Sequence, residues 1–237
     1  MSESLKPLPP AEVESDGQSP TSAVERVYRH TRTAILMGEY PPGFSLRMSD
    51  LAKLNGVSAI PVREAMRRLE AERLVESVAN KGVRVAQLSS ADLADAYQLR
   101  TILEAEAVRL TVPRLTDADR VQAEYLRDEM ARQFAAGDVA AAHAAHRALH
   151  FIVYERAGSP WLVHIISTLW DHTERYRRLG MRWLQHPEYL SAQHDDVIAA
   201  LFSGDVDAAV ESLRSHFEES RRLVKERVEP GEGNAAW

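Results

Sequence analysis

Apolar residues recur at helical spacing along most of the chain, and two β-like runs near residue 80 interrupt this pattern. The first helix is expected from about residue 22. Its apolar face comprises Val24, Val27, Tyr28, Thr31, Ala34 and Ile35. Gly38 and the Pro-Pro-Gly sequence at 41–43 end this helix. A second, short helix is expected over about 48–54, because Asn-Gly at 55–56 breaks it.

The third predicted helix has an apolar inner stripe and a basic outer face. Ser58 is a good N-cap for it, and Pro61 falls in its first turn, where the missing N–H costs little. The inner stripe comprises Val62, Ala65, Met66 and Leu69. Arg63 and Arg67 then lie one turn apart on the outer face.

Two short strands follow the third helix, over 75–78 and 83–86, and Asn-Lys-Gly at 80–82 is typical of the tight turn between them. Residues 56–84 therefore present a turn, an amphipathic helix with a basic face, and a two-stranded ribbon, in that order. This order suits a helix laid in the DNA major groove beside a β wing. The pattern favours a DNA-binding domain over residues 22–88.

From Ser90 onward the helical pattern continues with few interruptions. Helices are expected at about 90–112, 117–136, 138–157, 160–180, 188–203 and 205–227. Asp138 and Asp205 each follow a glycine and are suited to cap the helices that they begin. Residues 89–228 are thus predicted to form an all-α bundle. The polar segments 1–21 and 229–237 are expected to be a disordered arm and a disordered tail.

The composition is that of an ordinary globular protein, with 237 residues of which 45% are hydrophobic and 27% charged. No apolar run approaches the roughly 18 residues that span a bilayer, and the N-terminus lacks the features of a signal peptide. There is no cysteine, which excludes a disulfide framework and a thiolate metal site. These features predict a cytoplasmic protein with no membrane partner.

The formal net charge of −6 hides an uneven distribution. Residues 22–88 carry 11 lysines and arginines against 7 acidic residues, a balance of +4. The segments on either side are acidic, at −3 for 1–21 and −7 for 89–237. Basic charge is thus concentrated in the segment that carries the helix-and-wing pattern, as attraction to phosphates requires.

Histidines gather on three helices of the predicted bundle. His146 and His150 lie four apart in an alanine-rich helix and project from one face. His194 and His216 each share a stripe with aliphatic residues, so all these side chains are expected to point into the bundle. Neutral imidazole binds divalent transition metals, and bundle cores are common places for such sites.

Two motifs give the chain a family resemblance. The sequence YPPGFSLRMSDLAKLNGVSAIPVREAMRRLEAERLVE at 40–76, with NKGVRV at 80–85, resembles the winged helix of GntR-type transcription regulators. The helical remainder resembles the effector-binding domain called FCD, which defines the FadR-like branch of that family. The resemblance covers about residues 22–228. It implies a mainly α fold, with a winged helix-turn-helix of three helices and a small β wing, followed by an FCD bundle of six to seven helices.

The resemblance implies that the third helix enters the major groove of double-stranded operator DNA and that the wing contacts the backbone or the minor groove. Arg63, near the helix N-terminus, is placed for a guanine edge or a phosphate, and Ser58 for a phosphate oxygen. Lys81 and Gly82 at the wing tip suit close approach to the backbone. Further candidates on the basic surface are Arg67 and Arg47.

Two positions depart from the family pattern. Ala59 stands where the family usually has an arginine directly after the serine, and Ser49 stands where it usually has one before the Leu-Ala of the second helix. Two familiar DNA contacts are therefore missing. Ala59 and Ile60 instead suit apolar contact with a thymine methyl group, which predicts an operator unlike the common family type.

The FCD resemblance also implies a metal site. Metal-binding FCD domains have an acidic residue four positions before a first histidine, followed by two more histidines. His150, His194 and His216 fall on the three histidine positions, and His146 replaces the acidic residue. The site becomes richer in nitrogen, which favours a divalent transition metal such as zinc or nickel, or copper, over magnesium or manganese. The remaining bundle histidines are interpreted as structural or surface residues, namely His143, His164, His172 and His186.

A metal held by three or four protein ligands keeps a position open for water or a ligand carboxylate. Residues expected to line such a pocket are Tyr97, Arg100, Glu104, Arg175 and Tyr176. Arg100 matches an FCD arginine that often pairs with an acidic ligand. A surface or dimer-interface role explains each of these five residues equally well. The effector expected on this basis is a small organic acid.

We weigh three functions. The first is a homodimeric, ligand-responsive regulator, in particular a repressor, on a palindromic operator. The second is a metal-free FCD regulator with a larger acyl-type effector. The third is a metal-dependent hydrolase, but a zincin helix needs Glu directly after its first histidine, and this chain has Arg147 after His146. No Gly-x-Ser-x-Gly elbow or P-loop occurs either, so an enzyme is not expected.

Overall fold

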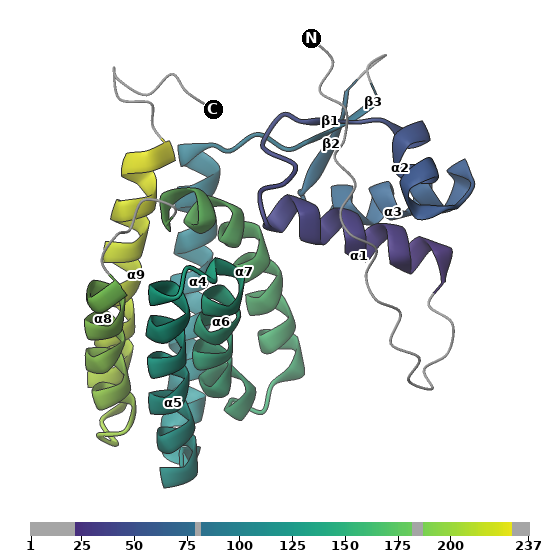
Figure 1. The fold of residues 1–237 in the computed structure, drawn as a ribbon. Helices are drawn as coiled ribbons and strands as arrows, with labels where there is room; N and C mark the ends of the chain where they lie inside the picture. The colour runs from purple at the N-terminus through teal and green to yellow at the C-terminus, as the bar shows by residue number, and fades with distance from the viewer. Residues whose placement is uncertain (1–21, 79–81, 182–186, 229–237) are drawn as a thin grey trace. The chain divides into compact units, whose positions relative to one another are not determined.

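The computed structural model describes residues 22–78, 82–181 and 187–228, and the chain divides between Gln87 and Leu88 into two compact units (Figure 1). Side chains are described over 22–78, 82–178 and 193–225. The expected disordered segments, 1–21 and 229–237, lie outside the described residues, as do Lys81 at the expected wing tip and His186.

The first unit contains three helices and a small sheet. Its elements are α1 (Ala23–Leu36), β1 (Ser45–Leu46), α2 (Met48–Asn55), α3 (Ala59–Ala71), β2 (Val75–Val78) and β3 (Gly82–Val85). The Ser22 side chain caps α1 by accepting a hydrogen bond from the Glu25 N–H. Gly56 ends α2 in the left-handed conformation, with φ +62°, and turns the chain into α3. The predicted winged helix-turn-helix is confirmed.

The sheet has one strand more than the pattern predicts. Its order is β1-β3-β2, and both pairs are antiparallel. Strand β1 consists of Ser45 and Leu46 alone, and two residues are too few to show an alternating pattern in the sequence. The strand is defined by its pairing with Arg84 and Val83 of β3. The prediction for Ser58 also needs correction. Ser58 occupies the N-cap position of α3, but its side chain makes no capping hydrogen bond.

The core of the first unit forms where the three helices meet the sheet. The predicted stripe of α3 is buried, with Val62, Ala65 and Leu69 fully inaccessible. These side chains pack with Val27, Ala34 and Ile35 of α1, Leu51 of α2, and Leu46, Val75, Val83 and Val85 of the strands. A Leu buried in this way contributes about 1.5–3 kcal/mol through removal from water. This packing fixes the inner face of α3 and leaves its other face to solvent.

The second unit is a helical bundle. Its described elements are α4 (Ser90–Thr111), the 3-10 turn η1 (Val112–Arg114), α5 (Asp117–Ala135), α6 (Val139–Arg156), α7 (Pro160–Met181), α8 (Pro187–Leu201) and α9 (Val206–Val228). The expected caps are confirmed, because the Asp138 and Asp205 side chains accept hydrogen bonds from the Ala141 and Ala208 N–H groups. The predicted all-α bundle is therefore confirmed, with boundaries within a few residues of those expected.

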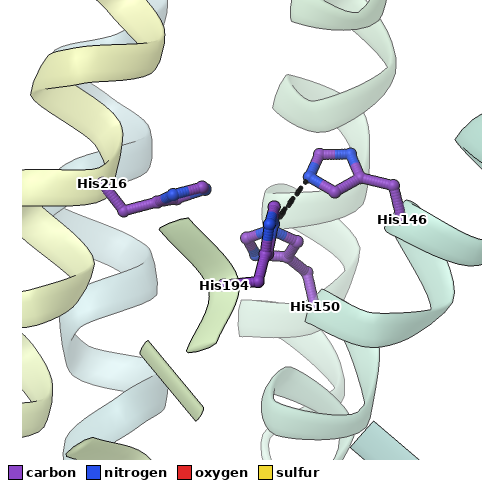
Figure 2. A group of neighbouring side chains, drawn as sticks. All are labelled: His146, His150, His194 and His216. Carbon is purple, nitrogen blue, oxygen red and sulfur yellow. Dashed lines mark hydrogen bonds between the residues drawn. The ribbon is translucent and has the colours of Figure 1, made fainter. Parts of the chain in front are cut away.

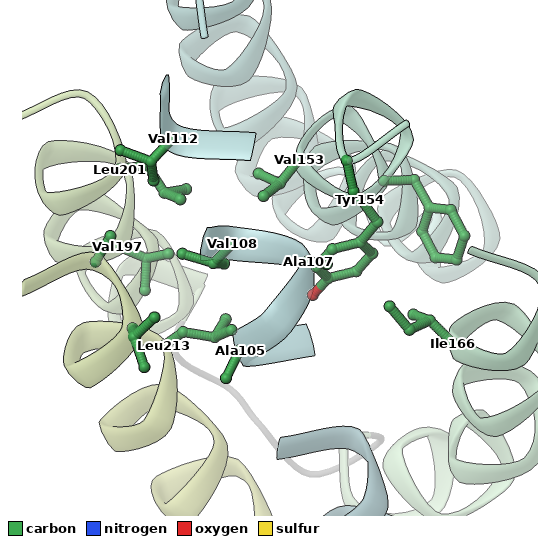
Figure 3. Close-up of a cluster of buried hydrophobic side chains, with 14 of the residues drawn as sticks. Ala105, Ala107, Val108, Val112, Val153, Tyr154, Ile166, Val197, Leu201 and Leu213 are labelled. Carbon is green, nitrogen blue, oxygen red and sulfur yellow. The ribbon is translucent and has the colours of Figure 1, made fainter. Parts of the chain in front are cut away.

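Helix α4 is the central helix of the bundle and packs against α6, α7 and α9, while α5 packs against α6 and α8 (Figure 1). The main apolar core surrounds α4, where Ala105, Val108 and Val112 meet Val153 of α6 and Leu213 of α9 (Figure 3). Because α4 has neighbours on several sides, it buries small and aliphatic residues around much of its circumference. No helix among the described residues is long and apolar enough to cross a membrane.

Candidate metal centre and DNA-recognition surface

The outer face of α3 presents a mixed apolar and basic surface. Ser58, Ala59, Ile60, Arg63 and Arg67 are all exposed, and Ile60 is 76% accessible. The five residues occupy the first turns of α3, the part of a recognition helix that reaches base edges.

The cations near this face differ in how they are paired. Arg68 contacts Glu25 at 2.8 Å and covers the Tyr28 ring at 3.8 Å, so it is used within the unit. Arg67 lies 3.6 Å from Glu64, with both side chains largely exposed. Arg63 has no ion pair with any residue that the structure describes. Of these three arginines, Arg63 is the one whose charge is fully available to a partner.

Further polar contacts fix the far end of α3 against α1. The Tyr28 hydroxyl donates a hydrogen bond to the Glu72 carboxylate, and Arg32 contacts the same carboxylate at 3.0 Å. Burial and the bond to Glu72 raise the pKa of Tyr28 to about 12. These contacts hold α3 at one orientation. Arg47, exposed at the start of α2, and Gly82, with φ +85° at the start of β3, complete the described part of the expected surface.

Four histidines converge inside the helical bundle. His146 and His150 come from α6, His194 from α8 and His216 from α9 (Figure 2). One nitrogen from each ring can be chosen so that all four lie within 4.8 Å of one another. Three are closer still, because the Nε2 atoms of His146, His150 and His194 are separated by 3.1, 3.2 and 3.2 Å. These three side chains are buried, and His216 is partly buried.

The surroundings keep three of the four imidazoles neutral. Burial holds the pKa of His146, His150 and His216 well below the ordinary histidine value, and the nearby positive groups lower it further. A neutral imidazole has one nitrogen lone pair available to a metal. His146, His150 and His216 can therefore bind a metal without the loss of protons that cationic rings would need.

The spacing of the nitrogens fits one metal ion. Histidine nitrogens lie about 2.0–2.1 Å from zinc, so separations near 3.15 Å correspond to angles at the metal of about 100°. That value lies between octahedral and tetrahedral geometry. The Nδ1 atom of His216 is buried and has no hydrogen-bond partner among the described residues. An unpaired buried nitrogen on the fourth ring of the group is a further sign that the donor set suits a cation.

A chain of hydrogen bonds begins at the Nδ1 atom of His150 and orients the ring. The His150 Nδ1 lies 3.1 Å from the Tyr154 hydroxyl, which donates to the Glu104 carboxylate. Because Tyr154 donates to Glu104, its oxygen accepts from His150 Nδ1–H, and this leaves His150 Nε2 as a lone pair facing the cluster. Glu104 is in turn held by Arg100 at 2.6 Å, and Arg100 contacts Thr173 at 3.0 Å. Burial and Glu104 raise the pKa of Tyr154 well above its ordinary value.

His146 has a different partner. Its Nδ1 lies 3.3 Å from Nη1 of Arg177, whose Nη2 donates to Glu174. Glu174 also contacts His143 at 2.8 Å and Arg178 at 2.9 Å, and the nearby positive charges lower its pKa despite burial. The Trp170 ring packs beside both His146 and His150, with ring centroids 5.4 and 4.9 Å away.

The structure separates the expected pocket residues into two groups. Arg100 and Glu104 reach the cluster through Tyr154, and the Tyr97 hydroxyl contacts Ser220 at 3.0 Å beside them. Tyr176 instead donates to Asp92 at 2.6 Å, an acceptor that it shares with His172. Arg175 is buried beside Tyr176 and Asp92. Arg175 and Tyr176 thus lie in another network from the one that holds the four histidines.

Sequence reasoning missed three residues that contact the cluster, namely Tyr154, Trp170 and Arg177. Tyr154 was detectable, since it lies four positions after His150 on the same helix face. Arg177 and Trp170 come from α7, and their approach depends on how α7 packs, which no local spacing reveals. A small apolar cavity of about 20 Å³ also adjoins His150 and His194, lined by Val108, Leu149, Val197, Ile198 and neighbouring aliphatic side chains.

Comparison with known proteins matches both units. Residues 23–85 match the family described as bacterial regulatory proteins, gntR family, and residues 95–219 match the FCD domain. One curated relative is the HTH-type transcriptional repressor GlaR of Escherichia coli K12, which is 32% identical over 80% of this chain and 90% of its own length. Another is an HTH-type transcriptional regulator, BphR, of Paraburkholderia xenovorans LB400, 29% identical over 86% of each chain.

Solved structures agree on the fold. The Escherichia coli McbR/YncC structure has a TM-score of 0.75 over 89% of this chain and all of its own, at 22% identity. A GntR-type regulator from Rhodococcus sp. RHA1 has a TM-score of 0.72, at 24% identity, over 86% of this chain and 98% of its own. The relatives are transcription regulators, not enzymes, in agreement with the expectation that this chain is no enzyme.

Proposed function

The chain belongs to the GntR family of bacterial regulatory proteins and carries an FCD domain, and from this premise we propose that it is a metal-dependent, carboxylate-responsive repressor. It would bind a palindromic operator as a homodimer. The observation that carries the proposal is the convergence of three buried Nε2 atoms within 3.2 Å of one another in the FCD domain.

The proposed DNA contacts follow from the exposed face of α3. Arg63, free of ion pairs with described residues, would read a guanine edge or hold a phosphate. Ala59 and Ile60 would contact a thymine methyl, and Ser58, Arg47 and Arg67 would serve the backbone. The wing would approach the backbone through Lys81 and Gly82. This combination lacks the two arginines usual in the family and supports an unusual half-site.

The proposed metal ligands are His146, His150, His194 and His216. Four neutral nitrogen donors favour zinc or nickel over the harder cations magnesium and manganese. When bound, such a metal supplies a Lewis-acidic position that takes one oxygen of a carboxylate. Tyr154 and Glu104 orient His150 through its Nδ1, as ligating histidines generally require.

The size of the site supports a small effector. The cavity beside His150 and His194 holds about 20 Å³, near the volume that one water molecule needs. A wider surface groove of about 560 Å³ involves Arg147, Phe151 and His164 but none of the four proposed ligands. A long acyl chain would therefore require the bundle to open, whereas a small carboxylate would need little displacement. The size of the cavity thus favours a regulator with a small effector at a metal over a metal-free regulator with a larger acyl effector.

Exposed apolar side chains on the bundle support a homodimer. Leu99 and Ile102 on α4 are 43% and 59% exposed, and Trp161 and Ile165 on α7 are 76% and 43% exposed. The two helices pack against each other, so these exposed residues lie on neighbouring helices. A second copy that covers these residues would place two winged helices on one operator. The effector would then act by binding two dimer states with different affinity.

Selection from random DNA tests the operator half of the proposal. We expect an inverted repeat whose half-site differs from the common family half-site, and binding that weakens steeply with salt. Recovery of the usual half-site would contradict the assigned roles of Ala59 and Ser49. Recovery of a single, unrepeated site would contradict the homodimer.

Elemental analysis tests the metal half. The purified wild type is expected to hold about one zinc or nickel ion per chain, and the double variant His150→Ala/His194→Ala none. A His164→Ala variant is the matched control, because His164 is an exposed histidine outside the cluster. Equal metal content in all three proteins would refute the site.

A further inference from the structure

We propose that Arg177 binds the carboxylate of the effector, and that metal binding at His146 releases it for this role. The inference deepens the proposed function and rests on it. Arg177 was not among the pocket residues expected from the sequence. It lies on α7 and is 3% exposed, so any partner that it takes must be inside the bundle.

The donors of Arg177 are incompletely used. Nη2 donates to Glu174, Nη1 makes a long 3.3 Å contact to His146, and Nε is buried with no partner among the described residues. The guanidinium carbon lies 4.1 Å from the centre of the Trp170 ring, which keeps the group in place. A buried N–H without an acceptor destabilises the folded protein. The group is therefore prepared for an acceptor that is brought in from outside.

The carboxylate partner of Arg177 is also shared with other groups. This partner, Glu174, is shared with Arg178 at 2.9 Å and with His143 at 2.8 Å. The Glu174 carboxylate thus divides its lone pairs between Arg177 and these neighbours. Arg100 differs, because its Nε and Nη1 are satisfied by Glu104 at 2.6 Å and Thr173 at 3.0 Å. Between these two buried arginines near the histidines, Arg177 is the one that an added anion would stabilise.

Metal binding changes what Arg177 can contact. A guanidinium only donates, so His146 accepts at Nδ1 in the present arrangement and its single ring hydrogen is on Nε2. A metal can bind at Nε2 only if the neutral ring carries its hydrogen on Nδ1 instead. Two N–H groups would then face each other, and the contact between Arg177 and His146 would be lost. Nη1 would then join Nε as a donor without an acceptor among the described residues, beside the His146 ring.

The ligand class follows from this geometry. One carboxylate oxygen would occupy the open metal position, and the other would accept from Arg177 in a charge-assisted hydrogen bond. The small cavity beside His150 and His194 has aliphatic walls and a volume of only about 20 Å³, which excludes a bulky substituent unless these side chains move. The site thus suits a small monocarboxylate, with acetate as its simplest representative.

Cobalt(II) substitution gives a direct test on the full-length protein. The visible spectrum reports metal uptake and the further change when acetate binds at the metal. Arg177→Gln should take up cobalt with affinity equal to or higher than wild type, because a competing contact and a positive charge are gone. Its affinity for acetate should fall at least tenfold. Arg177→Lys, which keeps the charge, should fall between the two and guards against misfolding of the glutamine variant. Arg178→Lys is the matched control and should bind acetate as wild type does.

The outcomes distinguish a failure of the role proposed for Arg177 from a failure of the proposed metal site. Wild-type acetate affinity in both Arg177 variants, with cobalt bound, would overturn the role of Arg177 and leave the metal site intact. Parallel loss of cobalt and acetate affinity in both variants would show a merely structural role and also overturn it. Failure of the wild type to take up cobalt would instead refute the proposed metal-dependent function.

Discussion

Replacement of His150 by leucine should make the stability of the metal-free protein less sensitive to acid. His150 is buried, and burial together with its neighbours holds its pKa well below the ordinary value in the folded state. In the unfolded chain the pKa is about 6.5. As the pH falls below that value, His150 binds a proton in the unfolded state but not in the folded state. Stability is therefore lost as the pH falls.

The magnitude follows from the unfolded-state pKa. Between pH 7.5 and 5.5, each histidine kept neutral by the fold removes about 1.4 kcal/mol of unfolding free energy. His146, His150 and His216 share this property, so together they remove up to about 4 kcal/mol. His150→Leu should lose about 1.4 kcal/mol less than wild type over the same interval. The difference between the two proteins cancels the contributions of other titrating groups.

Urea unfolding in the presence of a chelator measures this difference. All four tryptophans follow residue 160, so their fluorescence reports the helical domain and not the winged helix. His164→Gln, at an exposed position on α7, is the control and should behave as wild type. Equal losses of stability in wild type and His150→Leu would show that His150 is not held neutral, and would refute the account of the cluster.

Four further predictions follow from single contacts. Arg63→Ala should weaken operator binding by about 5- to 150-fold in fluorescence anisotropy. Arg68→Ala, which removes the partner of Glu25, should have a smaller effect, and the reverse order would contradict the role of Arg63 in DNA binding. Tyr154→Phe should lower metal affinity by about 10- to 100-fold in competition with a chelating dye, and no change would exclude Tyr154 as the support of a ligand. Thr116→Ala removes the capping box of α5 and should cost about 1 kcal/mol in thermal unfolding. Ile102→Glu should produce monomers in sedimentation equilibrium, and an unchanged dimer would place the interface elsewhere.

Helix boundaries were predictable because their signals are local. Asp138 and Asp205 follow glycines and cap the next helices, as their chemistry suggests. The burial of the inner stripe of α3 was likewise readable from its spacing. Strand β1 was not, since a two-residue strand is defined by its partner β3 and not by its own residues. Ser58 shows the limit of cap rules, because the position is right but the side-chain hydrogen bond is absent.

The histidine cluster shows the same division between local and tertiary information. His146 and His150 were expected on one face from their spacing, and the stripes of His194 and His216 predicted that both point inward. The structure brings all four together. Which arginine accompanies them depends on the packing of α7, which carries Arg177 to His146. Neighbouring Arg175 and Tyr176, expected near the pocket, lie instead with Asp92, because a shift of one or two positions turns a side chain to another face of a helix.

Anomalous diffraction from crystals of the full-length protein grown with zinc tests the metal centre most directly. The account predicts one peak per chain at the zinc absorption edge, about 2.0–2.1 Å from the Nε2 atoms of His146, His150 and His194, with His216 as the fourth ligand. Arg177 should no longer face His146 Nδ1 in that structure. A bundle interior without a peak, at zinc concentrations that label surface histidines, would contradict the central claim.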